Sequence, residues 1–154
     1  VRGNNIFARY VGKMASKDVL PKDYRDIIIM LLDKKVNINI RNKEGKSILS
    51  QLVAKKNMHA FRILLGIARF DLMIQDNRGF TIIHDCIISS NITVIRIINQ
   101  LEPKLKNIPD NIGLLPITYA ALFGNLKLVL VLMELESNFT SNKILSIAAK
   151  LKFR

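Results

Sequence analysis

The chain has 154 residues and a formal net charge of +12, because 24 Lys and Arg stand against 12 Asp and Glu. Apolar residues make up 49 % of it, and seven Gly and four Pro are few enough to exclude collagen, a disordered tail or a low-complexity linker. A single cysteine excludes an internal disulfide, and no stretch reaches the roughly 18 apolar residues of a membrane span, so we expect an intracellular protein, cytoplasmic or nuclear, without a transmembrane segment.

Positive charge is concentrated in the first half of the chain. Residues 1–41 have a net charge of +5 and residues 42–75 one of +4, so nine of the twelve excess charges precede residue 76. An excess of this size favours acidic partners, which include acidic protein surfaces, nucleic acids and anionic membranes. The alternative is that these charges only keep a chain rich in Ile, Lys and Asn in solution.

The sequence has a 34-residue period. Gly45, Gly79 and Gly113 mark it, and each is followed by a short apolar segment, a polar break and a second apolar segment. In one of these second segments the apolar positions 61, 64, 65 and 68 follow the spacing of one buried helix face. The period therefore predicts tandem units of two helices each.

The units follow one another along the chain at residues 3–41, 42–75, 76–109 and 110–140. The first unit opens at Gly3, which precedes Gly45 by more than one period, and this predicts an insertion around residues 16–21 between its two helices. Residues 141–154 hold one further helix, which either caps the array or begins a unit that continues beyond Arg154. We expect a single all-α domain of about four units of paired antiparallel helices and a terminal half-unit.

The turns of these units resemble the ankyrin repeat family. Residues 76–86 follow the family's pattern Asp-x-x-Gly-x-Thr-Pro-Leu-His-x-Ala, although the Pro is absent and Cys86 stands in place of Ala. Residues 110–121 keep Pro116 and the paired alanines but lose the Thr and the His, and residues 31–45 follow the family's passage between repeats. The resemblance implies an ankyrin-repeat solenoid, in which each helix pair buries its apolar face against its neighbours.

This resemblance also implies structural roles for several turn residues. The turn glycines adopt a positive φ, and Ser47, Thr81 and Ser141 cap the helices that follow them. His84 bonds to neighbouring polar groups and fixes its turn, and Cys86 is a buried and inert thiol.

We predict no catalytic residue, no metal site and no cofactor in this chain, which is therefore not an enzyme by itself. His84 and Cys86 are two residues apart on one helix, so their side chains point away from each other. No zinc pattern, P-loop or dinucleotide fingerprint occurs in the sequence. A catalytic domain elsewhere in a longer parent chain is left open, because this sequence begins without Met.

In ankyrin repeat proteins, partners bind mainly the turn tips and the outer face of the first helix of each repeat. Carried over by position, the resemblance gives a predicted partner surface of Lys43, Lys46, Lys55, Asn77, Arg78, Phe80, Ile88, Ile112, Leu114, Leu122 and Phe123. The surface is basic in its first unit and apolar in the later ones, and an exposed apolar patch typically marks an interaction site. The alternative is that some of these side chains pack under a neighbouring unit.

The leading hypothesis is a monomeric, non-catalytic module that binds a protein partner with an acidic rim. One alternative is weak nucleic-acid binding through the basic N-terminal half. Another is an accessory recognition domain of a larger enzyme, or of a pathogen effector that acts in the host cytoplasm.

Overall fold

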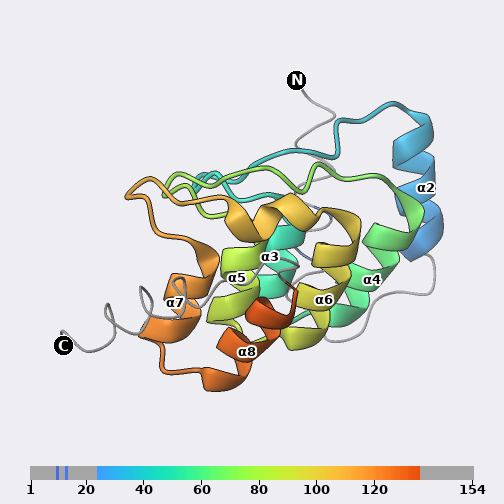
Figure 1. Ribbon diagram of the computed structural model, residues 1–154. Coiled ribbons are helices and arrows are strands. Elements are labelled where there is room, and N and C mark those ends of the chain that lie inside the picture. The colour runs from blue at the N-terminus through green and yellow to red at the C-terminus, as the bar shows by residue number, and fades with distance from the viewer. Residues whose placement is uncertain (1–9, 11–12, 14–23, 136–154) are drawn as a thin grey trace.

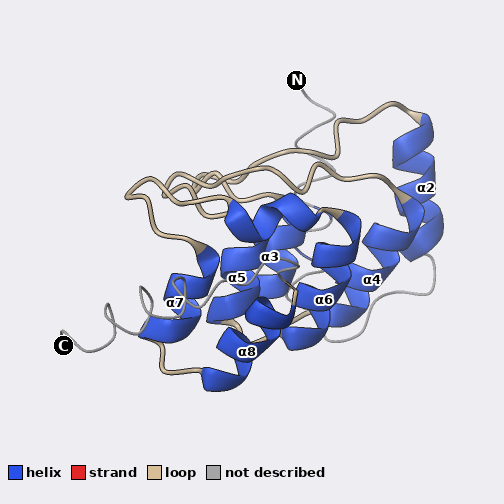
Figure 2. Ribbon diagram, in the orientation of Figure 1, coloured by secondary structure: helices blue, strands red, loops and turns tan. Residues whose placement is uncertain are grey.

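The computed structural model describes residues 10, 13 and 24–135 of the chain (Figure 1). These residues contain the helices α2 (Tyr24–Asp33), α3 (Ile48–Ala54), α4 (Met58–Ile67), α5 (Ile82–Ile88), α6 (Ile92–Leu101), α7 (Pro116–Leu122) and α8 (Leu126–Glu134), and the 3-10 helix η1 (Pro103–Asn107). No strand occurs among the described residues, so the predicted all-α class is confirmed for them (Figure 2). The predicted start of the first unit, its insertion, and the half-unit with Ser141 lie outside the described residues.

Three helix pairs follow one another in the predicted register. The first helices α3, α5 and α7 begin at residues 48, 82 and 116, and the second helices α4, α6 and α8 begin at 58, 92 and 126, so both series follow the period of the sequence. Each first helix packs against its own second helix, and α5 packs between α3 and α7. Helix α2 packs on α4, at the end of the row opposite to α7 (Figure 1).

Asparagine begins each second helix for the same local reason. The side chains of Asn57, Asn91 and Asn125 each accept a hydrogen bond from the backbone N–H three residues later, at 3.0, 3.1 and 3.2 Å. This bond satisfies one of the N–H groups that the first turn of a helix leaves without a partner. Ser47 caps α3 in the same way, as predicted, by accepting from the backbone N–H of Ser50 at 3.2 Å.

The three turns that precede the first helices form a hydrogen-bonded row. The backbone N–H of Asn77 donates to the carbonyl of Glu44 at 2.9 Å, and the Asn77 side chain donates to the carbonyl of Lys43 at 3.0 Å. Asn111, one period later, repeats both bonds to Arg78 and Asn77, at 3.0 and 2.9 Å. We call residues 43–46, 77–80 and 111–114 the three tips; this row of bonds holds them side by side.

Two features of the structure require glycine at position 79, and they predict that its replacement by alanine lowers stability measurably. Its φ is +82°, and a Cβ atom placed on it would lie 2.5 Å from the backbone nitrogen of Asn111. Gly113 also has a φ of +82°, but a Cβ atom there would meet no described heavy atom within 4 Å. We expect Gly113→Ala to lower the free energy of unfolding by about 1 kcal/mol, and Gly79→Ala by about 2 kcal/mol.

Urea denaturation of the two alanine variants separates the two causes, because both variants carry the same backbone penalty. Equal losses in the two variants would show that the tips are not packed as closely as the hydrogen bonds between them require.

The core lies between the two series of helices. Its largest fully buried side chains include Phe61, Leu49, Ile83 and Ile95. Most of the other core residues also come from the helices of the three pairs. Of the predicted face of α4, Phe61 and Leu64 are fully buried, whereas Leu65 is only half-buried. In the part of the chain that the structure describes, no helix combines the length and the apolar character needed to cross a membrane.

Candidate functional site

The predicted partner surface divides into side chains that the structure leaves free and side chains that it uses internally. Lys43, Lys55 and Asn77 are exposed, as expected, although the Asn77 amide already donates to the neighbouring tip. Leu114 is half-buried. The exposed apolar members are Ile88 at 48 %, Ile112 at 76 %, Leu122 at 38 % and Phe123 at 58 %.

Phe80 was expected on the exposed surface, and this expectation is wrong. Its side chain is only 7 % exposed. Its ring stacks on the His84 ring with centroids 4.8 Å apart, and it meets the edge of Tyr119 from the next helix pair at 5.0 Å. Phe80 therefore joins two helix pairs, which is the alternative that the sequence had left open.

Arg78 covers this aromatic cluster from the outside. Its guanidinium lies 4.2 Å from the centre of the Phe80 ring, and it donates to the Asp76 carboxylate through Nε at 3.3 Å and Nη2 at 3.1 Å. Asp76 is buried and also accepts the backbone N–H groups of Arg78 and Phe80, both at 2.9 Å. Although the Arg78 side chain is 57 % exposed, its charge is already paired within the tip.

Lys46 was expected as a free cation on the first tip, and this expectation is wrong as well. Its ammonium forms an ion pair with the carboxylate of Asp85 on α5, and the two side chains are 12 % and 3 % exposed. Burial raises the pKa of Asp85, and the neighbouring Lys46 opposes that rise. Lys46 therefore stabilises the junction between α3 and α5 and is not available to a partner.

The ion pair and the aromatic pair occupy the same place at two successive junctions. Phe80 follows Lys46 by one period, and Tyr119 follows Asp85 by one period. The Tyr119 hydroxyl donates to the carboxylate of Asp110 at 2.5 Å, and burial together with this bond raises the pKa of Tyr119 to about 12. Although burial acts to raise the pKa of Asp110, this bond and backbone N–H donors lower it overall.

The polar side chains of α5 are buried. Thr81 donates its backbone N–H to Nδ1 of His84 at 3.1 Å, so His84 fixes its turn as predicted, and burial lowers the pKa of His84 to about 4. Cys86 is fully buried, as predicted, and burial raises the pKa of its thiol. None of these groups reaches solvent, and no three His, Cys, Asp or Glu side chains converge on a possible metal position among the described residues.

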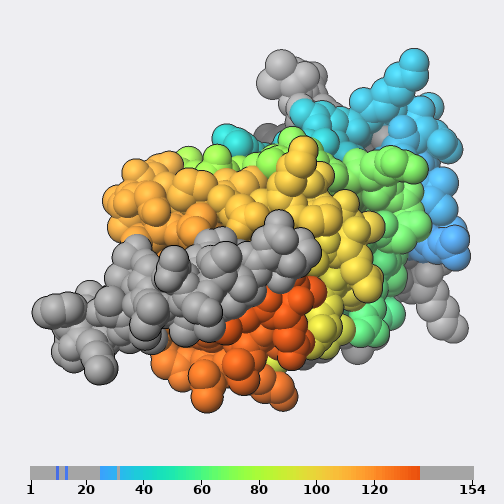
Figure 3. Space-filling model, viewed as in Figure 1, coloured from blue at the N-terminus to red at the C-terminus, as the bar shows by residue number. Residues whose placement is uncertain are grey.

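Several exposed apolar side chains lie on the third helix pair and on the adjoining end of α5. Ile88 and Leu122 are one period apart, and each is the last residue of a first helix. Phe123 follows Leu122, with its ring centre 6.2 Å from that of Tyr119, and Ile112 projects from the third tip. This tip, coloured orange, lies at the upper left of the space-filling view (Figure 3). Leu126, at 68 % exposure, belongs to the same helix pair and was missed by the sequence analysis.

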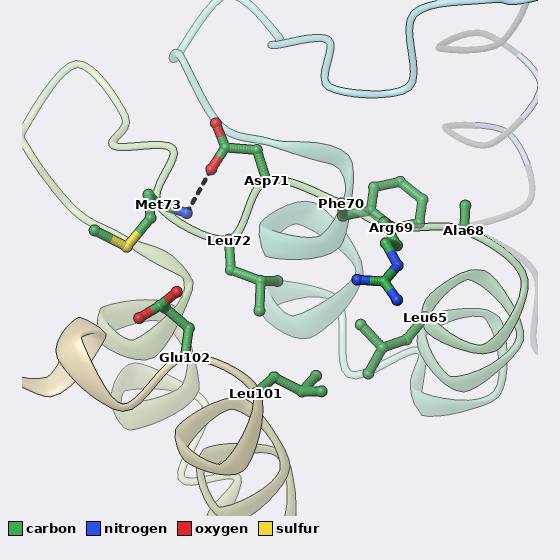
Figure 4. A pocket seen from close by; sticks show the side chains of 9 residues that line it. All are labelled: Leu65, Ala68, Arg69, Phe70, Asp71, Leu72, Met73, Leu101 and Glu102. Atoms are coloured by element: carbon green, nitrogen blue, oxygen red, sulfur yellow. Dashed lines mark hydrogen bonds between the residues drawn. The ribbon is translucent and has the colours of Figure 1, made fainter.

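Two hollows are lined entirely by residues that the structure describes. One, of about 500 Å³, lies between the first two tips and is lined by Glu44, Lys46, Asp76, Asn77 and Arg78, whose basic groups are both paired. The other, of about 430 Å³, lies between the C-terminal ends of α4 and α6 (Figure 4). The second hollow was not expected from the sequence, because none of its residues belongs to a tip or to a first helix.

Comparison of this sequence with protein-family models and with curated proteins finds no match to either. The assignment of a function therefore depends on the geometry of the chain itself.

Proposed function

We propose that this chain is an ankyrin repeat protein that binds another protein through the free part of the predicted partner surface. Three features support the family assignment: the common period of the helix pairs, the positive φ of all three tip glycines, and the contact of His84 with Thr81. The positive φ of Gly79 and the contact of His84 with Thr81 both lie within the predicted motif at residues 76–86.

The exposed apolar side chains are the observation that carries the binding function. Ile88 and Leu122 stand at equivalent ends of stacked helices, and Phe123 and Ile112 lie on the same helix pair as Leu122 or on its tip. Leaving them in water costs about 25 cal/mol for each Å² of apolar area. A partner that covers them removes this cost, and an aromatic side chain such as Phe123 is a frequent anchor of such interfaces.

The free charges favour an acidic rim on the partner. Lys43 and Lys55 are exposed and form no ion pair among the described residues, whereas Lys46 and Arg78 are neutralised within the chain. Charges at the rim of an interface act mainly on the association rate. Nucleic-acid binding through the basic N-terminal half stays a prediction, but this half has one free cation fewer than the sequence suggested, because Lys46 is paired.

Removal of the Phe123 ring should act on dissociation. We expect Phe123→Ala to release the partner about 10- to 30-fold faster than the unchanged chain, because truncation of an aromatic anchor costs about 2 kcal/mol or less. Lys43→Glu should instead slow association and leave dissociation nearly unchanged. The rates are measured by biolayer interferometry, on the partner recovered by affinity capture with the unchanged chain.

Met30→Ala is the matched control, because Met30 is also an exposed apolar side chain, at 54 %, and lies on the distant helix α2. Circular dichroism checks that each variant keeps its helices. Equal rate constants for all three variants and the unchanged chain would exclude this surface.

A further inference from the structure

The hollow between α4 and α6 is an apolar pocket with charged groups on its border. Its apolar walls come from Leu65, Phe70, Leu72 and Leu101, which Figure 4 shows around a common space. Its volume of about 430 Å³ is within the range of small-ligand sites, which is roughly 300–1,000 Å³. It lies at the C-terminal ends of the second helices and is built without any residue of the proposed partner surface.

The period of the sequence relates the pocket to the next junction of the chain. Lys106 follows Leu72 by one period of the repeat, and Leu135 follows Leu101 by one period. There the ammonium of Lys106 in η1 donates to the backbone carbonyl of Leu135, the C-cap residue of α8. At the end of α8 a lysine side chain therefore meets a backbone carbonyl, whereas the pocket has Leu72 at the position that corresponds to Lys106.

A cation is favoured at this place because the C-terminal end of a helix carries a partial negative charge. Helix α8 has no basic residue in its last turn and takes its cation from Lys106. Helix α6 also has no basic residue in its last turn, but its neighbour across the pocket is Leu72, which cannot supply one. Within the described part of the chain, the end of α6 therefore has no cation bonded to it as α8 has.

Two acidic residues border the pocket, and one of them is free to meet that cation. The Asp71 carboxylate accepts the backbone N–H of Met73 at 2.9 Å, a bond drawn in Figure 4. Glu102, the C-cap residue of α6, forms no side-chain hydrogen bond or ion pair within residues 24–135. Its carboxylate and the carbonyl end of α6 thus present negative charge beside the apolar surface of Leu101.

Arg69 supplies a positive charge at the other side of the same pocket. Figure 4 shows its guanidinium turned toward Leu65, away from Glu102. It is exposed and has no ion pair with any residue that the structure describes. The pocket therefore has an acidic end, an apolar middle and a basic end.

We propose that this pocket binds a lysine side chain of a partner protein, together with a carboxylate that lies close to that lysine in the partner. The aliphatic part of the lysine packs on Leu72 and Leu101, as long basic side chains do on apolar surfaces. Its ammonium reaches the carbonyl end of α6 and Glu102, and the partner carboxylate pairs with Arg69. The proposal is independent of the proposed function, because it uses a different surface.

The probe for this site is Nα-acetyl-L-lysine, which joins an ammonium, an aliphatic stem and a carboxylate. We expect it to shift the backbone amide signals of Leu72, Met73, Leu101 and Glu102 in ¹H–¹⁵N NMR spectra, with saturation at roughly millimolar concentration. Nα-acetyl-norleucine has the stem and the carboxylate but no ammonium, and should leave these signals unchanged up to the same concentration.

Leu72→Lys places in the pocket the residue type that the chain has one period later, at Lys106. The new ammonium should bind the carbonyl end of α6 as Lys106 binds the end of α8. The affinity for Nα-acetyl-L-lysine should then fall at least about tenfold. Leu72→Met is its matched control, since it keeps a long side chain without charge, and should bind the probe as the unchanged chain does. Leu72 is only half-buried, so both variants are expected to fold.

Three results would overturn the assignment. Equal binding of the probe to the Leu72→Lys and Leu72→Met variants would show that no cation is recognised. Equal binding of the norleucine derivative would make the pocket a site for apolar ligands. Shifts of the same signals when the protein alone is concentrated would identify a second copy of this chain as the occupant.

Discussion

Lys46→Met should lower the free energy of unfolding by about 3–5 kcal/mol, because it leaves the buried carboxylate of Asp85 without its cation. The Asp85 side chain is only 3 % exposed and cannot recover the lost interaction from water. Methionine keeps most of the aliphatic stem of lysine, so the loss reports on the charge. Urea denaturation followed by circular dichroism measures it.

The next junction of the same chain provides the control. Phe80 and Tyr119 fill there the place of Lys46 and Asp85, and they do so without an ion pair. The double change Lys46→Phe with Asp85→Tyr should therefore restore the stability of the unchanged chain to within about 1 kcal/mol, since well-packed replacements of buried ion pairs are often neutral or stabilising. A double variant as unstable as Lys46→Met would mean that the two junctions are not equivalent.

The helical architecture could be predicted because its signals are local. The regular spacing of the tip glycines, the asparagines before the second helices and the helical spacing of Phe61 and Leu64 each act through neighbouring residues. These signals place the helix pairs correctly along the chain, and the predicted capping by Ser47 is confirmed.

The exposure of individual tip residues could not be predicted in the same way, because it depends on a residue of the next helix pair. Lys46 is paired because Asp85 faces it, and Phe80 is buried because Tyr119 faces it. Leu114 holds the same position of the third tip, and it is half-buried. Position within the period shows which residues lie at a junction, but only the facing residue decides whether a side chain is left for a partner.

Ion pairs within the chain also reduce the positive charge that it offers to a partner. Nine of its twelve excess charges precede residue 76, but they include Lys46, which is neutralised by a residue beyond that boundary. Arg78, Arg96 and Lys46 all pair with acidic side chains, two of them in another helix pair. The net charge of a segment therefore overstates the charge that its surface offers.

Acid should destabilise this protein through His84. Burial holds the pKa of His84 at about 4 in the folded chain, against 6.5 for an ordinary histidine. Between these two values the unfolded chain binds a proton that the folded chain does not, so the free energy of unfolding falls as the pH falls from 6.5 toward 4. The contribution of this one residue reaches about 3 kcal/mol. Its main physical cause is burial of the ring. Nδ1 also accepts the N–H of Thr81, a bond that protonation of this atom would break.

His84→Gln isolates this contribution, because glutamine does not titrate and can still accept the Thr81 N–H through its amide oxygen. Asp85 acts in the opposite direction, since burial raises its pKa and acid then favours the folded chain, but it is present in both proteins. We therefore expect the unfolding free energy of the unchanged chain to decline more steeply between pH 6.5 and 4 than that of the variant. Urea denaturation at half-unit pH steps measures both slopes. Parallel slopes would show that His84 is protonated as easily in the folded chain as in the unfolded one, and that the aromatic cluster around Phe80 and Tyr119 does not exclude water from it.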